Sequence, residues 1–226
     1  MELKEYLQTT FPGLDLVPSL YNQWNIGLHF ELGRDLYQFK EDGRLNLELF
    51  EMVYSQAMAL FSYLFSEQDE IFLVTNVYRN KRNTRSNKIK VFERHLKNKA
   101  LKYNVKTQTL PFLYDDEEER DEYFTSQFYL KCRKSDINYP LLIRAACNED
   151  FPFKPKFGFS EGLFYPDVFF INISKNIIFF IYDDRGCEVI SKTKETICPL
   201  YTKYNDWIPE YNREEIEQLF KSPVIP

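Results

Sequence analysis

The stretch that decides the fold runs from Tyr165 to Ile190 and reads YPDVFFINISKNIIFFIYDDRGCEVI. Its two apolar segments, Val168–Ile173 and Asn176–Asp183, are rich in β-branched and aromatic residues and are separated by Ser174 and Lys175. Two such runs around a short polar pair predict a β-hairpin. Apolar side chains occupy successive positions along each run, so we expect both strands to be central in a sheet and covered on both faces.

The hairpin is expected to continue into a third strand and two helices, which together form a unit over residues 165–220. Asp183–Gly186 reads as a polar turn, with Gly186 free to adopt a positive φ, and Cys187–Ile190 can return as the third strand. Pro199 suits the first turn of a helix that Pro209 ends, and Asn212 suits the cap of a last helix. The inner face of the first helix is expected to contain Leu200, Tyr201, Tyr204, Trp207 and Ile208.

Upstream segments predict further strands and helices. Asn25–Leu32 alternates apolar and polar residues, which predicts a half-buried strand. Apolar residues recur at three- and four-residue steps from Phe50 to Phe65, which predicts an amphipathic helix beside a strand over Glu70–Tyr78. The other expected elements are a short helix that ends before Pro12, a helix over Ile89–Tyr103, and strands over Thr107–Leu113, Tyr123–Cys132 and Leu141–Cys147. We therefore predict a single α+β domain over residues 1–226, a mostly antiparallel sheet packed by several amphipathic helices.

Composition limits the class of protein. The chain has 226 residues, of which 44% are hydrophobic and 17% aromatic, so a substantial core of Phe and Tyr is expected. The N-terminus lacks the regions of a signal peptide and no apolar run is long enough to cross a bilayer, which favours a cytoplasmic protein without membrane contact. The wide spacing of Cys132, Cys147, Cys187 and Cys198 favours separate, mostly buried thiols over a metal site, and no motif indicates a cofactor.

Charge is divided into two blocks. Between Arg79 and Lys106 every charged residue except Glu93 is basic, whereas Asp115–Glu122 is almost entirely acidic, in a chain of formal net charge −5. The basic block can bind nucleic acid by releasing counterions, can attract an acidic protein partner, or can simply be solvated and paired with the acidic block. Its candidate binding residues are Arg79, Lys81, Arg82, Arg85, Lys90, Arg94 and Lys97.

The sharpest candidate for chemistry is the turn Asp183, Asp184 and Arg185. Adjacent carboxylates can hold a divalent cation or act as acid and base, and an arginine can bind an anion. The competing interpretation is a structural turn in which Asp caps backbone amides and Arg pairs with an acid. Because successive strand residues point to opposite faces, the two aspartates need not share a site. A metal-dependent nuclease is excluded, since Glu188 lacks the Lys that should follow two positions later.

His29 and Glu31 lie on one face of the first predicted strand and could be two metal ligands. No further ligands lie nearby in the sequence, so a solvated or hydrogen-bonded pair is the favoured interpretation.

Five segments carry a resemblance to a known family. Tyr182–Ile190, Leu200–Ile208 and Tyr211–Arg213, together with Phe30–Gly33 and Phe92–Asn98, resemble the sequence blocks of the bacterial domain-of-unknown-function family 3885. The resemblance implies a cytoplasmic bacterial protein and brings no activity with it.

The expected function is therefore inferred from the charges on the surface of the protein. An aromatic core without a catalytic set, combined with charged blocks of opposite sign, favours a non-enzymatic protein-interaction module of the immunity or antitoxin kind, with a protein partner. The alternatives are an enzyme with a carboxylate site at residues 183–185 and a nucleic-acid-binding protein that uses segment 79–106.

Overall fold

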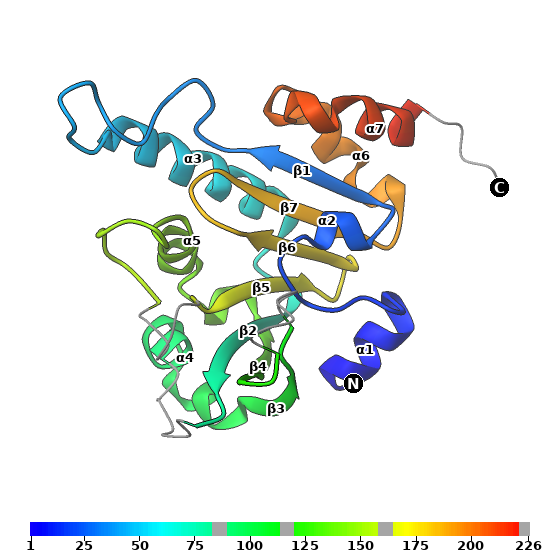
Figure 1. Ribbon diagram of the computed structural model, residues 1–226. Coiled ribbons are helices and arrows are strands. Elements are labelled where there is room, and N and C mark those ends of the chain that lie inside the picture. The colour runs from blue at the N-terminus through cyan, green and yellow to red at the C-terminus, as the bar shows by residue number, and fades with distance from the viewer. Residues whose placement is uncertain (83–89, 114–119, 158–164, 222–226) are drawn as a thin grey trace.

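The computed structural model describes residues 1–82, 90–113, 120–157 and 165–221. Within these residues seven strands form one antiparallel sheet in the order β1-β7-β6-β5-β2-β4-β3 (Figure 1). The strands are β1 (Gly27–Glu31), β2 (Glu70–Asn80), β3 (Lys106–Pro111), β4 (Tyr123–Arg133), β5 (Asp167–Asn172), β6 (Ile177–Ile181) and β7 (Gly186–Ser191). The predicted α+β class with a mostly antiparallel sheet is confirmed.

Helices cover both faces of this sheet. One core cluster joins the sheet to α3, α4, α5 and α6, and the other joins the opposite face to α1 and the segment that follows it. The α-helices are α1 (Leu3–Thr10), α2 (Leu20–Gln23), α3 (Leu47–Leu64), α4 (Lys90–His95), α5 (Tyr139–Cys147), α6 (Lys194–Lys203) and α7 (Glu210–Lys221). Shorter 3-10 helices are η1 (Lys99–Asn104), η2 (Lys134–Asp136) and η3 (Asn205–Trp207). None of the described helices is long and apolar enough to span a membrane.

The predicted hairpin and third strand are present as β5, β6 and β7. Every residue of these three strands is buried, so the expectation of central strands covered on both faces is confirmed. Phe179 and Phe180 show the reason, because successive side chains enter the two different core clusters. The four cysteines are free thiols, and Cys132, Cys147 and Cys187 are buried as expected.

The predicted strand over Leu141–Cys147 is wrong, because this segment is helix α5. Asn138 precedes the helix and Pro140 occupies its first turn, where a missing backbone N–H costs nothing. Leu142, Ile143 and Ala146 are buried against α3 and the sheet. A short apolar run has the same appearance in a buried helix as in a buried strand, and here tertiary packing selects the helix.

The single helix expected over Ile89–Tyr103 is also wrong. The chain forms α4, breaks, and begins the 3-10 helix η1 after Asn98, whose side chain accepts a hydrogen bond from the N–H of Ala100 at 3.1 Å. This local bond competes with helix continuation. Tyr103 is consequently 80% exposed instead of lying on a buried helix face.

Three expectations near the C-terminus need correction. Pro199 lies inside α6, not in its first turn, and α6 ends at Lys203 before η3, so no helix runs unbroken from 200 to 208. Asn212 lies within the first turn of α7 instead of capping it, because α7 begins at Glu210. Gly186 does not have a positive φ; its lack of a Cβ serves close packing, as shown below.

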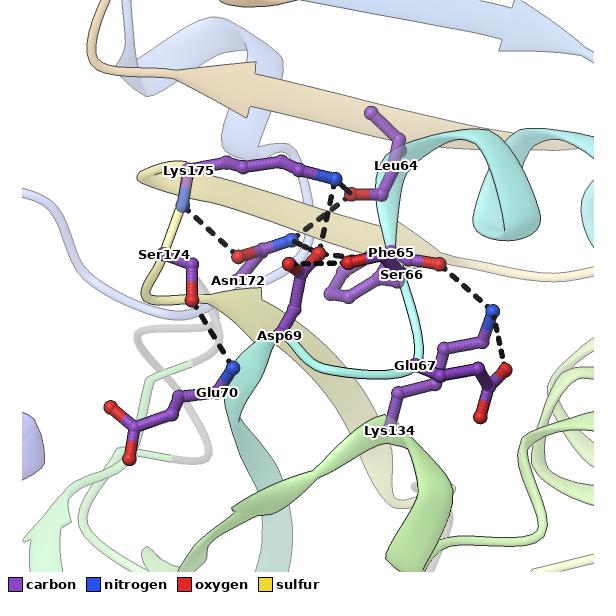
Figure 2. A network of polar contacts seen from close by, with 10 residues as sticks. All are labelled: Leu64, Phe65, Ser66, Glu67, Asp69, Glu70, Lys134, Asn172, Ser174 and Lys175. Carbon is purple, nitrogen blue, oxygen red and sulfur yellow. Dashed lines mark hydrogen bonds and ion pairs between the residues drawn. The ribbon is translucent and has the colours of Figure 1, made fainter.

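A network of hydrogen-bonded polar residues lies at the end of β5 that contains Asn172 (Figure 2). Asp69 accepts hydrogen bonds from Ser66 N at 2.8 Å, Ser66 Oγ at 2.6 Å and Asn172 Nδ2 at 2.7 Å, and its carboxylate lies 3.0 Å from Lys175 Nζ. Both Asn172 and Lys175 also donate to the carbonyl of Leu64, which ends α3. The network ties the α3–β2 connection to the β5–β6 hairpin.

Candidate functional site

A cavity of about 450 Å³ lies at the other end of β5, where this strand begins and β6 ends. Figure 1 shows α2 beside β7 and α7 beside β1. Residues of these four elements line the cavity together with the start of β5, the end of β6 and the turn that follows it. A neighbouring hollow of about 830 Å³ shares Tyr182, Arg185 and Tyr211 with this cavity. We call the smaller cavity the cleft; its polar and aromatic lining consists of Ser19, Tyr21, Asn22, His29, Glu149, Asp167, Phe180, Tyr182, Asp183, Arg185, Glu188, Tyr211 and Asn212.

His29 is held in the cleft wall through both ring nitrogens. Its Nδ1 lies 2.7 Å from Asn212 Oδ1 and its Nε2 lies 2.8 Å from Tyr182 Oη. An amide oxygen can only accept, so Nδ1 carries the proton and Nε2 accepts from the phenol of Tyr182. Burial lowers the pKa of His29 and favours this neutral ring. His29 is therefore a hydrogen-bonded residue, whereas Glu31 turns to Arg34 at 3.9 Å, so the two do not form a metal pair.

The contacts of the Asp183–Arg185 turn agree in part with the interpretation in which Asp caps a backbone amide and Arg pairs with an acid. Asp183 Oδ1 accepts from the backbone N–H of Arg185 at 2.7 Å, and Asp183 Oδ2 accepts from Arg185 Nε at 2.8 Å and pairs with its Nη2. Both oxygens of Asp183 are thus used locally. Asp184 is buried separately and accepts from Gln38 Nε2 at 3.2 Å.

The two aspartates nevertheless lie close together. Carboxylate oxygens of Asp183, Asp184 and Asp150 all lie within 4.8 Å of one another. The alternation rule does not separate Asp183 from Asp184, because the chain has left β6 and is in a turn at this point.

Several acidic residues of the cleft carry no sequence motif. Burial, followed by the charges of Asp167, Asp150 and Asp183, raises the pKa of Glu149 to about 9. Burial raises the pKa of Asp167 to about 7, although a hydrogen bond from Tyr78 opposes this rise. Burial also raises the pKa of Glu188. The available signal was weak: Asp167 borders an apolar run and Glu188 interrupts one, which is an unusual place for a charge, whereas Glu149 lies between Asn148 and Asp150 and gives no such signal.

Gly186, the first residue of β7, has to lack a side chain because Tyr182 packs directly against its backbone. A Cβ at this position would lie 2.0 Å from Tyr182 Oη and 2.6 Å from the backbone oxygen of Phe30. We expect Gly186→Ala to lower the free energy of unfolding by about 2 kcal/mol and to break the Tyr182–His29 hydrogen bond. Urea unfolding and the His29 ring resonances in NMR measure the two effects. Gly43→Ala is the control for the His29 resonances alone, because a Cβ there meets nothing within 4 Å, although its φ of +78° gives that variant a stability cost of its own. Unchanged His29 resonances in Gly186→Ala would contradict this packing.

The basic candidates lie elsewhere on the molecule. The β2–β4 pairing brings the ends of the two charged blocks together: Arg82 pairs with Glu122 at 3.1 Å, and Lys81 Nζ donates to the carbonyl of Asp121 at 2.9 Å. Arg79 is half-buried and lies 5.7 Å from the Phe128 ring centre.

The other basic candidates are either exposed or lie outside the residues that the structure describes. Arg94 and Lys97 are exposed at α4 and just after it. Arg85 and the side chain of Lys90 fall outside the described residues. None of the described members lines the cleft.

Fold and cleft together define an α+β protein with a polar, ligand-sized cavity at one end of an antiparallel sheet. The sequence model described as "Domain of unknown function (DUF3885)" matches residues 3–212, and the chain belongs to this family. "Uncharacterized protein YnaE" of Bacillus subtilis (strain 168) is 47% identical over 212 residues, which cover 93% of this chain and 99% of that protein. No solved structure matches significantly. The resemblance noted in the sequence is thus confirmed, and three of its segments, Phe30–Gly33, Tyr182–Ile190 and Tyr211–Arg213, meet around the cleft and the hollow beside it.

Proposed function

We propose that the protein binds a small polar molecule in the cleft beside the Asp183–Arg185 turn. The observation that carries this proposal is the convergence of His29, Tyr182, Glu188 and Asn212, from β1, the β6–β7 turn, β7 and α7, on one cavity of about 450 Å³. That volume falls in the range of small-molecule sites, which combine apolar walls with a few convergent polar groups.

Two further features support a binding site over a chance hollow. His29 is fixed from both sides by Asn212 and Tyr182, so its orientation is set before any ligand arrives. Burial raises the pKa of both Glu149 and Asp167, and neighbouring acids raise that of Glu149 further; such shifted carboxyl groups are concentrated at functional sites.

The hypotheses of an immunity-like interaction module and of nucleic-acid binding stay predictions. Contacts between the charged blocks, such as Arg82 with Glu122, reduce the number of free charges that could steer a partner. The geometry favours the cleft.

A ligand screen with an occlusion variant tests the proposal. Asn22 lines the cleft and is exposed, so Asn22→Trp should fill the cavity without disturbing the core. The matched control is Gln23→Trp, which adds the same side chain to the same helix at a position that does not line the cleft.

We expect thermal-shift hits that stabilise the wild type and Gln23→Trp but not Asn22→Trp. A ligand present at about 100 times its Kd should stabilise the fold by about 2.7 kcal/mol. Hits that stabilise all three proteins equally, or a library without hits, would count against the cleft as the functional site.

A further inference from the structure

We propose that the ligand of the cleft is an organic cation bearing an ammonium or guanidinium group, and that it enters in exchange for protons held by the cleft's carboxyl groups. This inference rests on the proposed function and specifies its ligand class. Four kinds of observation carry it: the balance of charged groups, the burial of two aspartates, an aromatic wall and the spacing of the acids.

Acidic groups outnumber basic ones in the cleft lining. The acidic residues of this lining are Glu149, Asp167, Asp183 and Glu188. Arg185 is the one described Lys or Arg among the lining residues. Arg185 is already paired with Asp183, and its side chain is 67% exposed, so it directs its charge partly to solvent. His29 is neutral for the reasons given above. Among the described residues Asp167 and Glu188 therefore have no Lys or Arg paired with them, whereas Glu149 is influenced by the charge of Lys156.

Two aspartates are buried beside the cleft and the adjoining hollow. Asp167 is 6% exposed and Asp184 is 3% exposed. Asp167 accepts through Oδ2 from Tyr78, and Asp184 accepts through Oδ2 from Gln38. Asp167 lines the cleft and Asp184 the adjoining hollow. A carboxylate can accept several hydrogen bonds, so an ammonium or guanidinium group placed there can donate to these two side chains.

An aromatic wall favours an organic cation over a bare metal ion. The rings of Tyr21, Tyr182 and Tyr211 lie 6.1, 5.7 and 5.8 Å from the His29 ring, centre to centre. Ammonium and guanidinium groups gain from contact with such faces. Both oxygens of Asp183 are occupied by Arg185, which weakens the Asp150, Asp183 and Asp184 group as a metal site.

Proton exchange follows from the packing of the acids against one another. Three negative charges raise the pKa of Glu149: those of Asp167 on β5, Asp150 on its own segment and Asp183 on the turn. The positive charge of Lys156 lowers it. Asp167 faces Tyr78 on β2. With pKa values raised to about 9 and about 7, Glu149 holds its proton at neutral pH and Asp167 is about half protonated. A cation stabilises their ionised forms, so binding releases protons and the affinity rises with pH until about pH 9.

Isothermal titration with agmatine, cadaverine and choline tests the inference, with butylurea and glutarate as neutral and anionic probes of similar size and MgCl₂ as the metal probe. Each titration is run in phosphate and in HEPES, whose different ionisation enthalpies report proton release and neither of which is a primary ammonium ion. We expect at least one cationic probe to bind with proton release, and to bind about tenfold more weakly to Glu149→Gln with fewer protons released. Asp167→Asn, which keeps the side-chain shape, should act in the same direction. Glu48→Gln removes an exposed carboxylate outside the cleft and should change nothing.

The possible outcomes separate the two proposals. A neutral or anionic probe that binds the wild type but not Asn22→Trp would overturn the cation inference and leave the binding function standing. Magnesium as the sole binder, cationic probes that bind no better than butylurea and glutarate, or unchanged proton release in Glu149→Gln, would each overturn the inference. Heat signals that Asn22→Trp leaves unaltered for every probe would contradict both proposals.

Discussion

Phe61→Ala is expected to lower the free energy of unfolding by about 4 kcal/mol, because it removes the ring at the centre of the larger core. Phe61 lies on α3 and is 0% exposed. Its ring stacks on Phe65 at 4.4 Å and on Tyr139 at 4.9 Å, and Phe170 approaches edge-on at 5.0 Å, all between ring centres. Alanine would leave a cavity that helices and sheet cannot both close.

Urea unfolding followed by far-UV circular dichroism measures this loss. Phe61→Leu retains much of the volume and should cost less than half as much. Tyr63→Ala on the exposed side of the same helix is the control, since Tyr63 is 40% exposed, and it should cost less than about 1 kcal/mol. Equal losses for Phe61→Ala and Tyr63→Ala would show that α3 does not bury the face described here.

Asp69→Ala is expected to lower the free energy of unfolding by about 3 kcal/mol, because it leaves buried donors without an acceptor. Asp69 is 8% exposed and is the acceptor shared by Ser66, Asn172 and Lys175 (Figure 2). Glu70→Gln is the control: the side chain of Glu70 is 56% exposed and pairs at 3.2 Å with Lys131, which is 40% exposed, so the change should cost less than about 1 kcal/mol.

The same residue gives a pH dependence with a definite sign. Burial alone would raise the pKa of Asp69, but the hydrogen bonds from Ser66, Lys175 and Asn172 together outweigh it and lower the pKa from 3.8 to about 2. The stabilisation is therefore complete above about pH 4 and disappears as the pH falls towards 2. A shift of this size corresponds to about 2 kcal/mol. Denaturation curves of wild type and Asp69→Ala should converge over this range, and curves that stay parallel would contradict the network.

Local sequence pattern was sufficient to predict the middle of the sheet and one of its edge strands, β1. The continuous apolar runs around Ser174 and Lys175 predict β5 and β6, and alternation predicts β1, because strand periodicity is a property of neighbouring residues. Pattern failed for α5, where Leu142 to Cys147 suit either buried state. It also failed where a single side chain changes the backbone path, as Asn98 does between α4 and η1.

Of the residues that line the cleft, the sequence singled out only the Asp183–Arg185 turn and His29. Asp183–Arg185 stood out because the three charged residues are adjacent in the chain and directly follow a strand. Glu149, Asp167 and Glu188 come from three separate segments, and only sheet register and the position of α5 bring them together. His29 was noticed for Glu31 on its own strand, whereas its actual partners, Tyr182 and Asn212, lie more than 150 positions away.

A crystallographic fragment screen tests the central claim most directly, because it locates bound molecules of any chemical class on the whole surface of the protein. We predict that fragments will gather in the cleft, in contact with His29, Glu188 or Tyr211, more often than at any other surface. Fragments that bind elsewhere, while the cleft contains ordered water alone, would contradict the claim that this cavity is the functional site of the protein.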